Sequence, residues 1–144
     1  MARKLDRQGV FDFIVEKPRT GHLATVREDG RPHVATIWIA VDREREEIVF
    51  NTGVTSVKGK NLLRTGYAAL AVDDDEPPFS FVTLEGPVTL SEDPAELRRW
   101  AAIIGGRYMG VDQAEAFGER NGVPGEYVVR LRPTHMTGVA DIAE

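Results

Sequence analysis

Hydrophobic residues along this chain gather in short, β-branched segments separated by turn residues, a pattern typical of β-strands. An Asp29-Gly30 pair between the first two segments favours a hairpin, because both positions tolerate a positive φ. Gly86 and Pro87 interrupt the fifth segment and predict a bend there. We expect strands over residues 21–27, 31–41, 48–52, 67–72, 79–90 and 127–132, with 133–142 extending the last one after a kink.

Apolar residues at helical spacing predict a few short helices. Asp6 suits the N-cap of the first helix and Thr55 or Ser56 that of the second, because their oxygens can accept from free amides of the first turn. Asp93 opens the third helix. The expected helices run from near Leu5 to before Pro18, over 57–64, from Pro94 to a break at Gly105-Gly106, and over 112–120.

Six antiparallel strands, hairpin turns and a few short helices predict a mostly β protein that forms a small closed barrel. A doubly wound parallel sheet would need a helix between successive strands, and none is expected between the first and second or the second and third. The 144 residues fit one domain, residues 1–144, without an internal repeat.

Composition excludes several functions. The absence of cysteine rules out a disulfide scaffold, a thiolate metal site and a cysteine nucleophile. A net charge of −5 argues against a nucleic-acid partner. The N-terminus has no apolar signal core, and the longest run free of charge and turn residues, Val34–Val41, is far shorter than a membrane span. We therefore expect a soluble, cytoplasmic protein that binds no membrane.

No metal site and no catalytic residue emerge from the remaining polar residues. The three histidines lie far apart, the acidic run 73–76 lacks calcium-loop spacing, and no serine lies in a nucleophile elbow. Phe79 and Phe81 are interpreted as sharing one strand face, either in a core or interface or as the wall of a flat ligand site.

The stretch from Asn51 to Leu62 carries the clearest chemical signal. It runs from a strand through a small polar loop into a helix, and exposed amides at a helix N-terminus form an anion site. Lys58 and Lys60 lie in the first turn, where the helix dipole disfavours positive charge, so a bound phosphate would explain them. The alternative is a solvated helix start. A Walker A loop is excluded because Asn61 stands where Ser or Thr is required.

Several stretches together resemble the pyridoxamine 5′-phosphate oxidase-like split β-barrel superfamily, and most closely its small actinobacterial members, the F420-dependent reductases. The resemblance covers roughly residues 8–141. It is carried by the hairpin GHLATVREDGRPHV (21–34), by Ile37-Trp38-Ile39, by SVKGKNL (56–62) and by LEGPV (84–88).

The resemblance implies a six-stranded split barrel, the FMN-binding split barrel, which forms a homodimer with two cofactor sites at the interface. It also assigns residues to the phosphate, to the tricyclic ring and to the partner subunit. The phosphate would lie against Ser56, Val57 and Lys58, with Lys60 and Asn61 in the same element; the ring along Thr36, Ile37 and Trp38, near Asn51 and Thr52; and the partner would close the ring through Phe79 and Phe81.

The chain lacks the C-terminal Arg and His segment of true pyridoxamine phosphate oxidases, so vitamin B6 oxidation is not expected. The deazaflavin coenzyme F420 carries an oligoglutamate tail, and arginine suits carboxylates. Candidates to meet that tail are Arg27, Arg31, Lys60 and Arg64.

The predicted function is therefore that of an oxidoreductase that uses reduced coenzyme F420 to transfer hydride to an unsaturated or quinone-like small molecule. The alternatives are an FMN-dependent oxidoreductase and a non-catalytic protein that binds flavin or deazaflavin.

Overall fold

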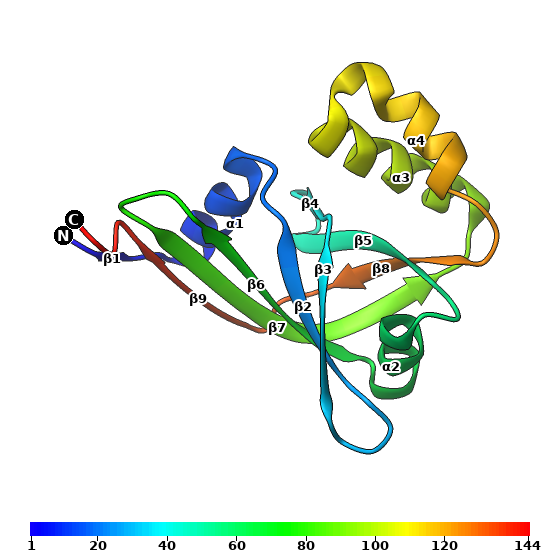
Figure 1. The fold of residues 1–144 in the computed structure, drawn as a ribbon, viewed down its shortest axis with the longest axis horizontal. Helices are drawn as coiled ribbons and strands as arrows, with labels where there is room; N and C mark the ends of the chain where they lie inside the picture. The colour runs from blue at the N-terminus through cyan, green and yellow to red at the C-terminus, as the bar shows by residue number, and fades with distance from the viewer.

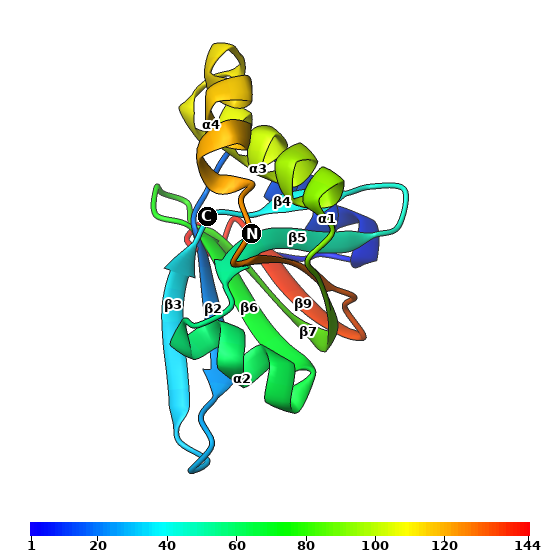
Figure 2. The same ribbon diagram turned by 90° about the vertical axis from the view of Figure 1, so that its right-hand side faces the viewer.

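The computed structural model describes all residues from Met1 to Glu144 as one antiparallel sheet with four α-helices (Figures 1 and 2). The strands are β1 (Arg3–Lys4), β2 (Gly21–Val26), β3 (Pro32–Ile37), β4 (Ala40–Asp42), β5 (Glu47–Gly53), β6 (Tyr67–Asp74), β7 (Ser80–Ser91), β8 (Glu126–Leu131) and β9 (His135–Ala140). The helices are α1 (Arg7–Glu16), α2 (Val57–Thr65), α3 (Pro94–Met109) and α4 (Ala114–Asn121), with a short 3-10 turn, η1 (Val111–Gln113).

The sheet runs in the order β3-β2-β6-β7-β8-β5-β4. Strand β7 also pairs with β9, and β9 pairs with β1. The end strands of the sheet, β3 and β4, do not pair, so the expected closed barrel is wrong. The sheet is instead a split, half-barrel sheet, the class that the resemblance implies. Figure 2 shows α3 and α4 at one end of the molecule and the tip of the β2–β3 hairpin, with α2 beside it, toward the other.

Strand β7 changes partner at the predicted bend. Its residues 81–85 pair with β9, whereas 88–91 pair with β8. Between them, a Cβ on Gly86 would lie 2.1 Å from the carbonyl oxygen of Arg132, so only glycine lets the chain approach this closely. The bend at Gly86 and Pro87 is therefore confirmed.

Nine strands form where six were expected. The predicted strand 31–41 divides because Trp38 leaves the ladder and stacks on Tyr108, while the Ile39 amide donates to the Tyr108 hydroxyl at 3.0 Å. The kinked extension of the last predicted strand becomes the separate strand β9. The short β1 pairs with it through Arg3 and Lys4.

The main core lies inside the half-barrel and is closed at one side by α1. This helix begins at the predicted N-cap, where the Asp6 carboxylate accepts from the Gly9 amide at 2.8 Å. Val10, Phe11 and Ile14 project from it into the cluster formed by the strands. Most of the expected helix and strand positions are confirmed to within a few residues.

A second core cluster forms where α3 packs on β4, β5 and β8. It buries Leu97, Trp100 and Ile104 against Ala40, Val49 and Val128. The outer side of the chain's own sheet therefore covers this apolar stripe, which is not available to a partner subunit.

Helix α3 does not end at Gly105-Gly106 but continues to Met109. The two glycines instead make room for the next helix, α4, to pack against α3. A Cβ on Gly105 would lie 2.2 Å from the Cβ of Phe117, so its absence allows α4 to lie directly on α3. No helix of the chain has both the length and the apolar character needed to cross a membrane.

Candidate functional site

The start of α2 is held rigidly on the end of β5. The Ser56 hydroxyl donates to the Gly53 carbonyl at 2.7 Å and accepts from the Gly59 amide at 3.0 Å, which makes Ser56 the N-cap. A Cβ on Gly59 would lie 2.2 Å from the Gly53 carbonyl oxygen, so glycine is required for this contact. Thr52 is buried beneath the cap, with its hydroxyl 3.2 Å from that of Ser56.

This arrangement leaves two amides free at the helix N-terminus. The amides of Val57 and Lys58 precede the first intrahelical hydrogen bond and make none elsewhere in the chain. The half-buried Lys58 forms no ion pair, and the first turn has no acidic residue. Free amides beside an unpaired cation at a helix N-terminus are a geometry suited to an anion, and the predicted anion site stays a prediction. The Ser56 hydroxyl is already committed to the cap.

Lys58 lies at one border of a cleft of about 300 Å³, which we call the α3 cleft. Strands β3, β5 and β8 line one side, and α3 and α4 the other. The lining residues are Thr36, Ile37, Trp38, Asn51, Lys58, Ala101, Ile104, Gly105, Asn121 and Glu126. Five of the predicted ligand-binding residues are therefore gathered around one cavity.

The aromatic wall of the α3 cleft is Trp38. Its ring is stacked on Tyr108, with centroids 4.9 Å apart and planes within 3°, and Phe117 lies tilted beside it at 6.1 Å. Trp38 is still 37% exposed, so part of its ring surface is accessible. The indole can therefore contact a flat ligand while Tyr108 fixes its orientation.

Strand β3 offers backbone groups rather than side chains to such a ligand. It pairs only with β2, which leaves the amides and carbonyls along its other edge without sheet partners. The Ile37 side chain, 7% exposed, is buried in the main core, whereas Thr36 points outward. In addition, the buried Asn51 Oδ1 has no hydrogen-bond donor. A ring bearing N–H and C=O groups matches this donor and acceptor set.

Glu126 also lines the α3 cleft, although no motif around it points to a functional role. It is half-buried, and burial raises the pKa of its carboxyl above the ordinary value, while the positive charge of Lys58 partly opposes that shift. Its place follows from the strand register, in which Glu126 stands opposite Gly53. No local motif reports such a long-range pairing.

On its other side, α2 borders a second cavity of about 460 Å³, the hairpin groove, between the helix and the β2–β3 hairpin. It is lined by Arg27, Glu28, Asp29, Val57, Lys60, Asn61 and Arg64. Three basic and two acidic side chains give it a small positive excess. Arg31, also a candidate, does not line it and instead lies 3.7 Å from Asp29.

Two predicted ligand residues in this groove hold the helix in place. The Asn61 amide donates to the Thr25 hydroxyl at 3.0 Å, and both side chains are buried. Arg64 donates to Asn61 Oδ1 at 2.9 Å and to the Val26 carbonyl. These contacts hold α2 against β2 and occupy the Arg64 guanidinium. Lys60 is therefore more available than Arg64 to bind a ligand.

Phe79 and Phe81 line neither cavity within one chain. They also do not share a strand face, because Phe79 adopts a left-handed conformation (φ 61°) just before β7 begins at Ser80. Phe79 lines a separate polar cavity near Arg19, and Phe81 is exposed on β7. The shared-face interpretation is therefore wrong.

Comparisons with known proteins agree with this architecture. A sequence profile described as pyridoxamine 5′-phosphate oxidase matches residues 9–140. No curated protein sequence matches significantly.

Solved structures give close superpositions. A conserved hypothetical protein of Mycobacterium tuberculosis is 26% identical, with a TM-score of 0.78 over 92% of this chain and 82% of its own. An F420 reductase is 27% identical, with a TM-score of 0.69 over 87% of this chain and 94% of its own. A heme storage protein of Vibrio cholerae, 17% identical with a TM-score of 0.68 over 92% and 94%, shares the fold alone.

Proposed function

We propose, from the premise that the chain belongs to the pyridoxamine 5′-phosphate oxidase family, that it is an oxidoreductase that uses reduced coenzyme F420. The hydride would pass to an unsaturated or quinone-like small molecule. The observation that carries this proposal is that Lys58, beside two free helix amides, lies at the border of a cleft walled by Trp38 and an edge strand. That set fits a phosphate joined to a flat ring.

The chain's own residues would bind and orient the cofactor. Lys58 and the amides of Val57 and Lys58 would hold the phosphate, and the free edge of β3 would pair with polar groups of the ring. Trp38 would exclude water from one part of the ring. When bound, reduced F420 supplies the hydride itself, so the site needs no charged catalytic residue.

The hairpin groove favours F420 over FMN. Both cofactors carry a phosphate, but F420 adds a tail of glutamate carboxylates, and the groove is bordered by the same helix, α2, that borders the α3 cleft. Its basic side chains, Arg27, Lys60 and Arg64, are suited to carboxylates. A structural relative with 27% identity is named an F420 reductase, which supports the same choice.

Lys60→Ala is expected to weaken F420 binding about twofold to fivefold and to leave FMN binding nearly unchanged, since one exposed ion pair contributes roughly 0.5–1 kcal/mol. The loss should grow with tail length and shrink with added salt. Fluorescence titration with both cofactors measures it. Arg31→Ala is the matched control, because Arg31 is exposed outside the groove. Equal losses for FMN and F420 would contradict the tail assignment.

Two other functions fit the same cleft. An FMN-dependent oxidoreductase would use the phosphate site and the ring edge alone, and a non-catalytic carrier would bind the cofactor without turnover. Absorbance spectra of the purified protein, titrated with FMN and F420, separate the cofactors. A panel of electron acceptors then tests turnover. Tight binding of FMN without F420 binding would overturn the F420 proposal.

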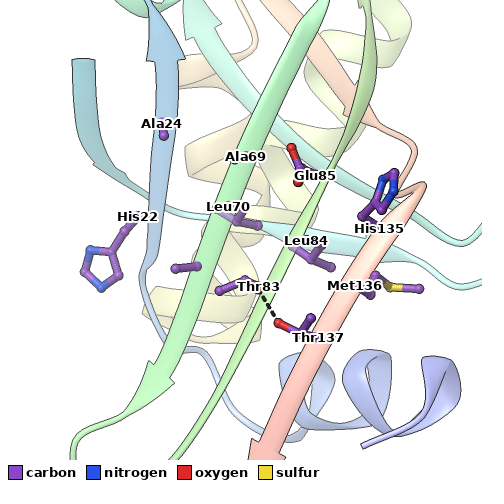
Figure 3. A pocket seen from close by; sticks show the side chains of 11 residues that line it. His22, Ala24, Ala69, Leu70, Thr83, Leu84, Glu85, His135, Met136 and Thr137 are labelled. Carbon is purple, nitrogen blue, oxygen red and sulfur yellow. Dashed lines mark hydrogen bonds between the residues drawn. The ribbon is translucent and has the colours of Figure 1, made fainter. Parts of the chain in front are cut away.

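We also propose that the protein is a homodimer, assembled through the outer face of the sheet. The strand register places small and polar residues side by side on this face. Figure 3 shows the four adjacent strands, β2, β6, β7 and β9, that line a hollow of about 310 Å³ there. Ala24, Ala69 and Ala71 would let a second sheet approach closely. Phe81 lies on the same face, where it could reach a partner's site.

Ala71→Arg is expected to convert the dimer to a monomer, because a long, charged side chain in the middle of a close-packed face would hold the second sheet away and would be desolvated. Sedimentation at micromolar concentration measures the mass. Leu63→Arg is the matched control, since Leu63 is 65% exposed on α2, away from this face. A wild-type protein that sediments as a monomer would overturn the dimer proposal.

A further inference from the structure

Glu126 lies unpaired in the α3 cleft. No side chain or amide donates a hydrogen bond to its carboxylate, and no cation lies within ion-pair distance of it. Its Oε2 lies 3.2 Å from the position that a Cβ on Gly53 would occupy, so the carboxylate lies against the start of the loop that leads into α2. A half-buried carboxylate without donors is costly, and the structure gives it no stabilising role.

The charged groups around Glu126 are few. Lys58 is the only other charged side chain that lines the α3 cleft. On its other side, Glu126 borders a smaller cavity in which Glu92 is the only other charged residue. Lys58 therefore faces one carboxylate across the cleft. It is also the residue that would meet a cofactor phosphate.

We propose that Glu126 opposes the binding of anionic ligands at Lys58, so that the phosphate of a cofactor enters the α3 cleft together with a proton that Glu126 takes up. This inference rests on the proposed function, because it assumes that a phosphate binds there. It adds a residue that sets how affinity depends on charge and pH.

The physical reason is competition for one cation. In the free protein, the ionised carboxylate of Glu126 is stabilised mainly by the positive charge of Lys58. A phosphate at the α2 amides would neutralise Lys58 and place a like charge near the carboxylate. Both changes favour the protonated carboxyl, so binding raises the pKa of Glu126 further.

The direction of the pH dependence follows. At low pH Glu126 is neutral in the free and bound protein and has little effect on affinity. As pH rises through the pKa of the free protein, ionised Glu126 increasingly opposes the phosphate, so affinity falls. Above the pKa of the bound protein the opposition is complete and affinity levels off. A like charge within about 4–6 Å of a carboxylate changes its proton affinity by roughly tenfold or more, and linkage carries the same factor into the affinity for the phosphate.

The test compares wild type, Glu126→Gln and Glu92→Gln by isothermal titration with FMN, F420 and riboflavin, from about pH 5 to about pH 8. Glutamine keeps the shape and removes the charge, so the fold should be retained, and thermal melting checks it. Riboflavin lacks the phosphate. Because the FMN phosphate itself titrates near pH 6, the comparison is between variants at each pH, which cancels that contribution.

We expect Glu126→Gln to bind FMN or F420 about tenfold more tightly than wild type near pH 8, with a difference that shrinks as the pH falls. Proton uptake, obtained from binding heats in buffers of different ionisation enthalpy, should be smaller for this variant. Riboflavin affinity and the Glu92→Gln control should change little. Equal affinities and equal proton uptake at every pH would overturn the inference while leaving cofactor binding intact. Failure of wild type to bind any of the three would overturn the proposed function and this inference together.

Discussion

Lys58→Ala is expected to weaken the binding of F420 and FMN by about tenfold to a hundredfold, because a charge-assisted contact to a phosphate contributes about 1.5–3 kcal/mol. Lys58 is half-buried at the border of the α3 cleft, and no carboxylate pairs with it there. Its charge is thus available to a ligand. Riboflavin, which has no phosphate, should lose little affinity. Fluorescence titration with the three ligands gives the comparison.

The fold should tolerate this substitution. A lysine in the first turn of a helix opposes the dipole, so its removal costs little stability. Ser56 and Gly59 keep the helix start in place independently of Lys58. For FMN, which has no glutamate tail, the matched control is Lys60→Ala, two residues along the same helix but on the hairpin groove. An unchanged affinity of Lys58→Ala for FMN and F420 would remove the phosphate site and, with it, the basis of the proposed function.

Local signals in the sequence predicted most of the elements. Asp6 and Ser56 cap helices because their short side chains reach amides three residues ahead, and such contacts depend only on neighbouring residues. Two of the expectations that were wrong depend on distant residues. Gly105 does not end α3 because Phe117 packs against it, and the long second strand divides because Tyr108 stacks on Trp38.

The candidate site shows the same division. The α2 start was predictable because its loop, cap and lysines are contiguous. Glu126 was not, since its position opposite Gly53 depends on the pairing of β5 with β8. Likewise, nothing in the sequence indicates that α2 borders two cavities, or that the Asn61 side chain is hydrogen-bonded to Thr25 on β2. The residue types in the α2 loop predicted an anion site, whereas the sheet register determines which distant residues, such as Glu126, lie next to it.

Ile37→Asp is expected to unfold the protein or nearly so. Ile37 lies in the main core with a 7% exposed side chain, so the change loses apolar burial and leaves a carboxyl group without a partner. Together these effects cost at least about 4 kcal/mol, a large part of the roughly 5–15 kcal/mol that stabilises a domain of this size. The buried carboxyl would have a raised pKa, so the loss should be smaller at acidic pH than at neutral pH.

Thr36→Asp separates the effect on folding from the effect on the site. Thr36 precedes Ile37 on β3, is exposed and lines the α3 cleft. The new carboxylate would therefore stay hydrated, and the fold should be retained. It would add a negative charge to the cleft that receives the anionic cofactor, and we expect cofactor binding to weaken several-fold at low salt. Chemical denaturation measures the stability of both variants, and fluorescence titration measures binding by Thr36→Asp. If Ile37→Asp folds with wild-type stability, the side chain does not face the core; if Thr36→Asp binds F420 and FMN as well as wild type, the cofactor does not approach this end of β3.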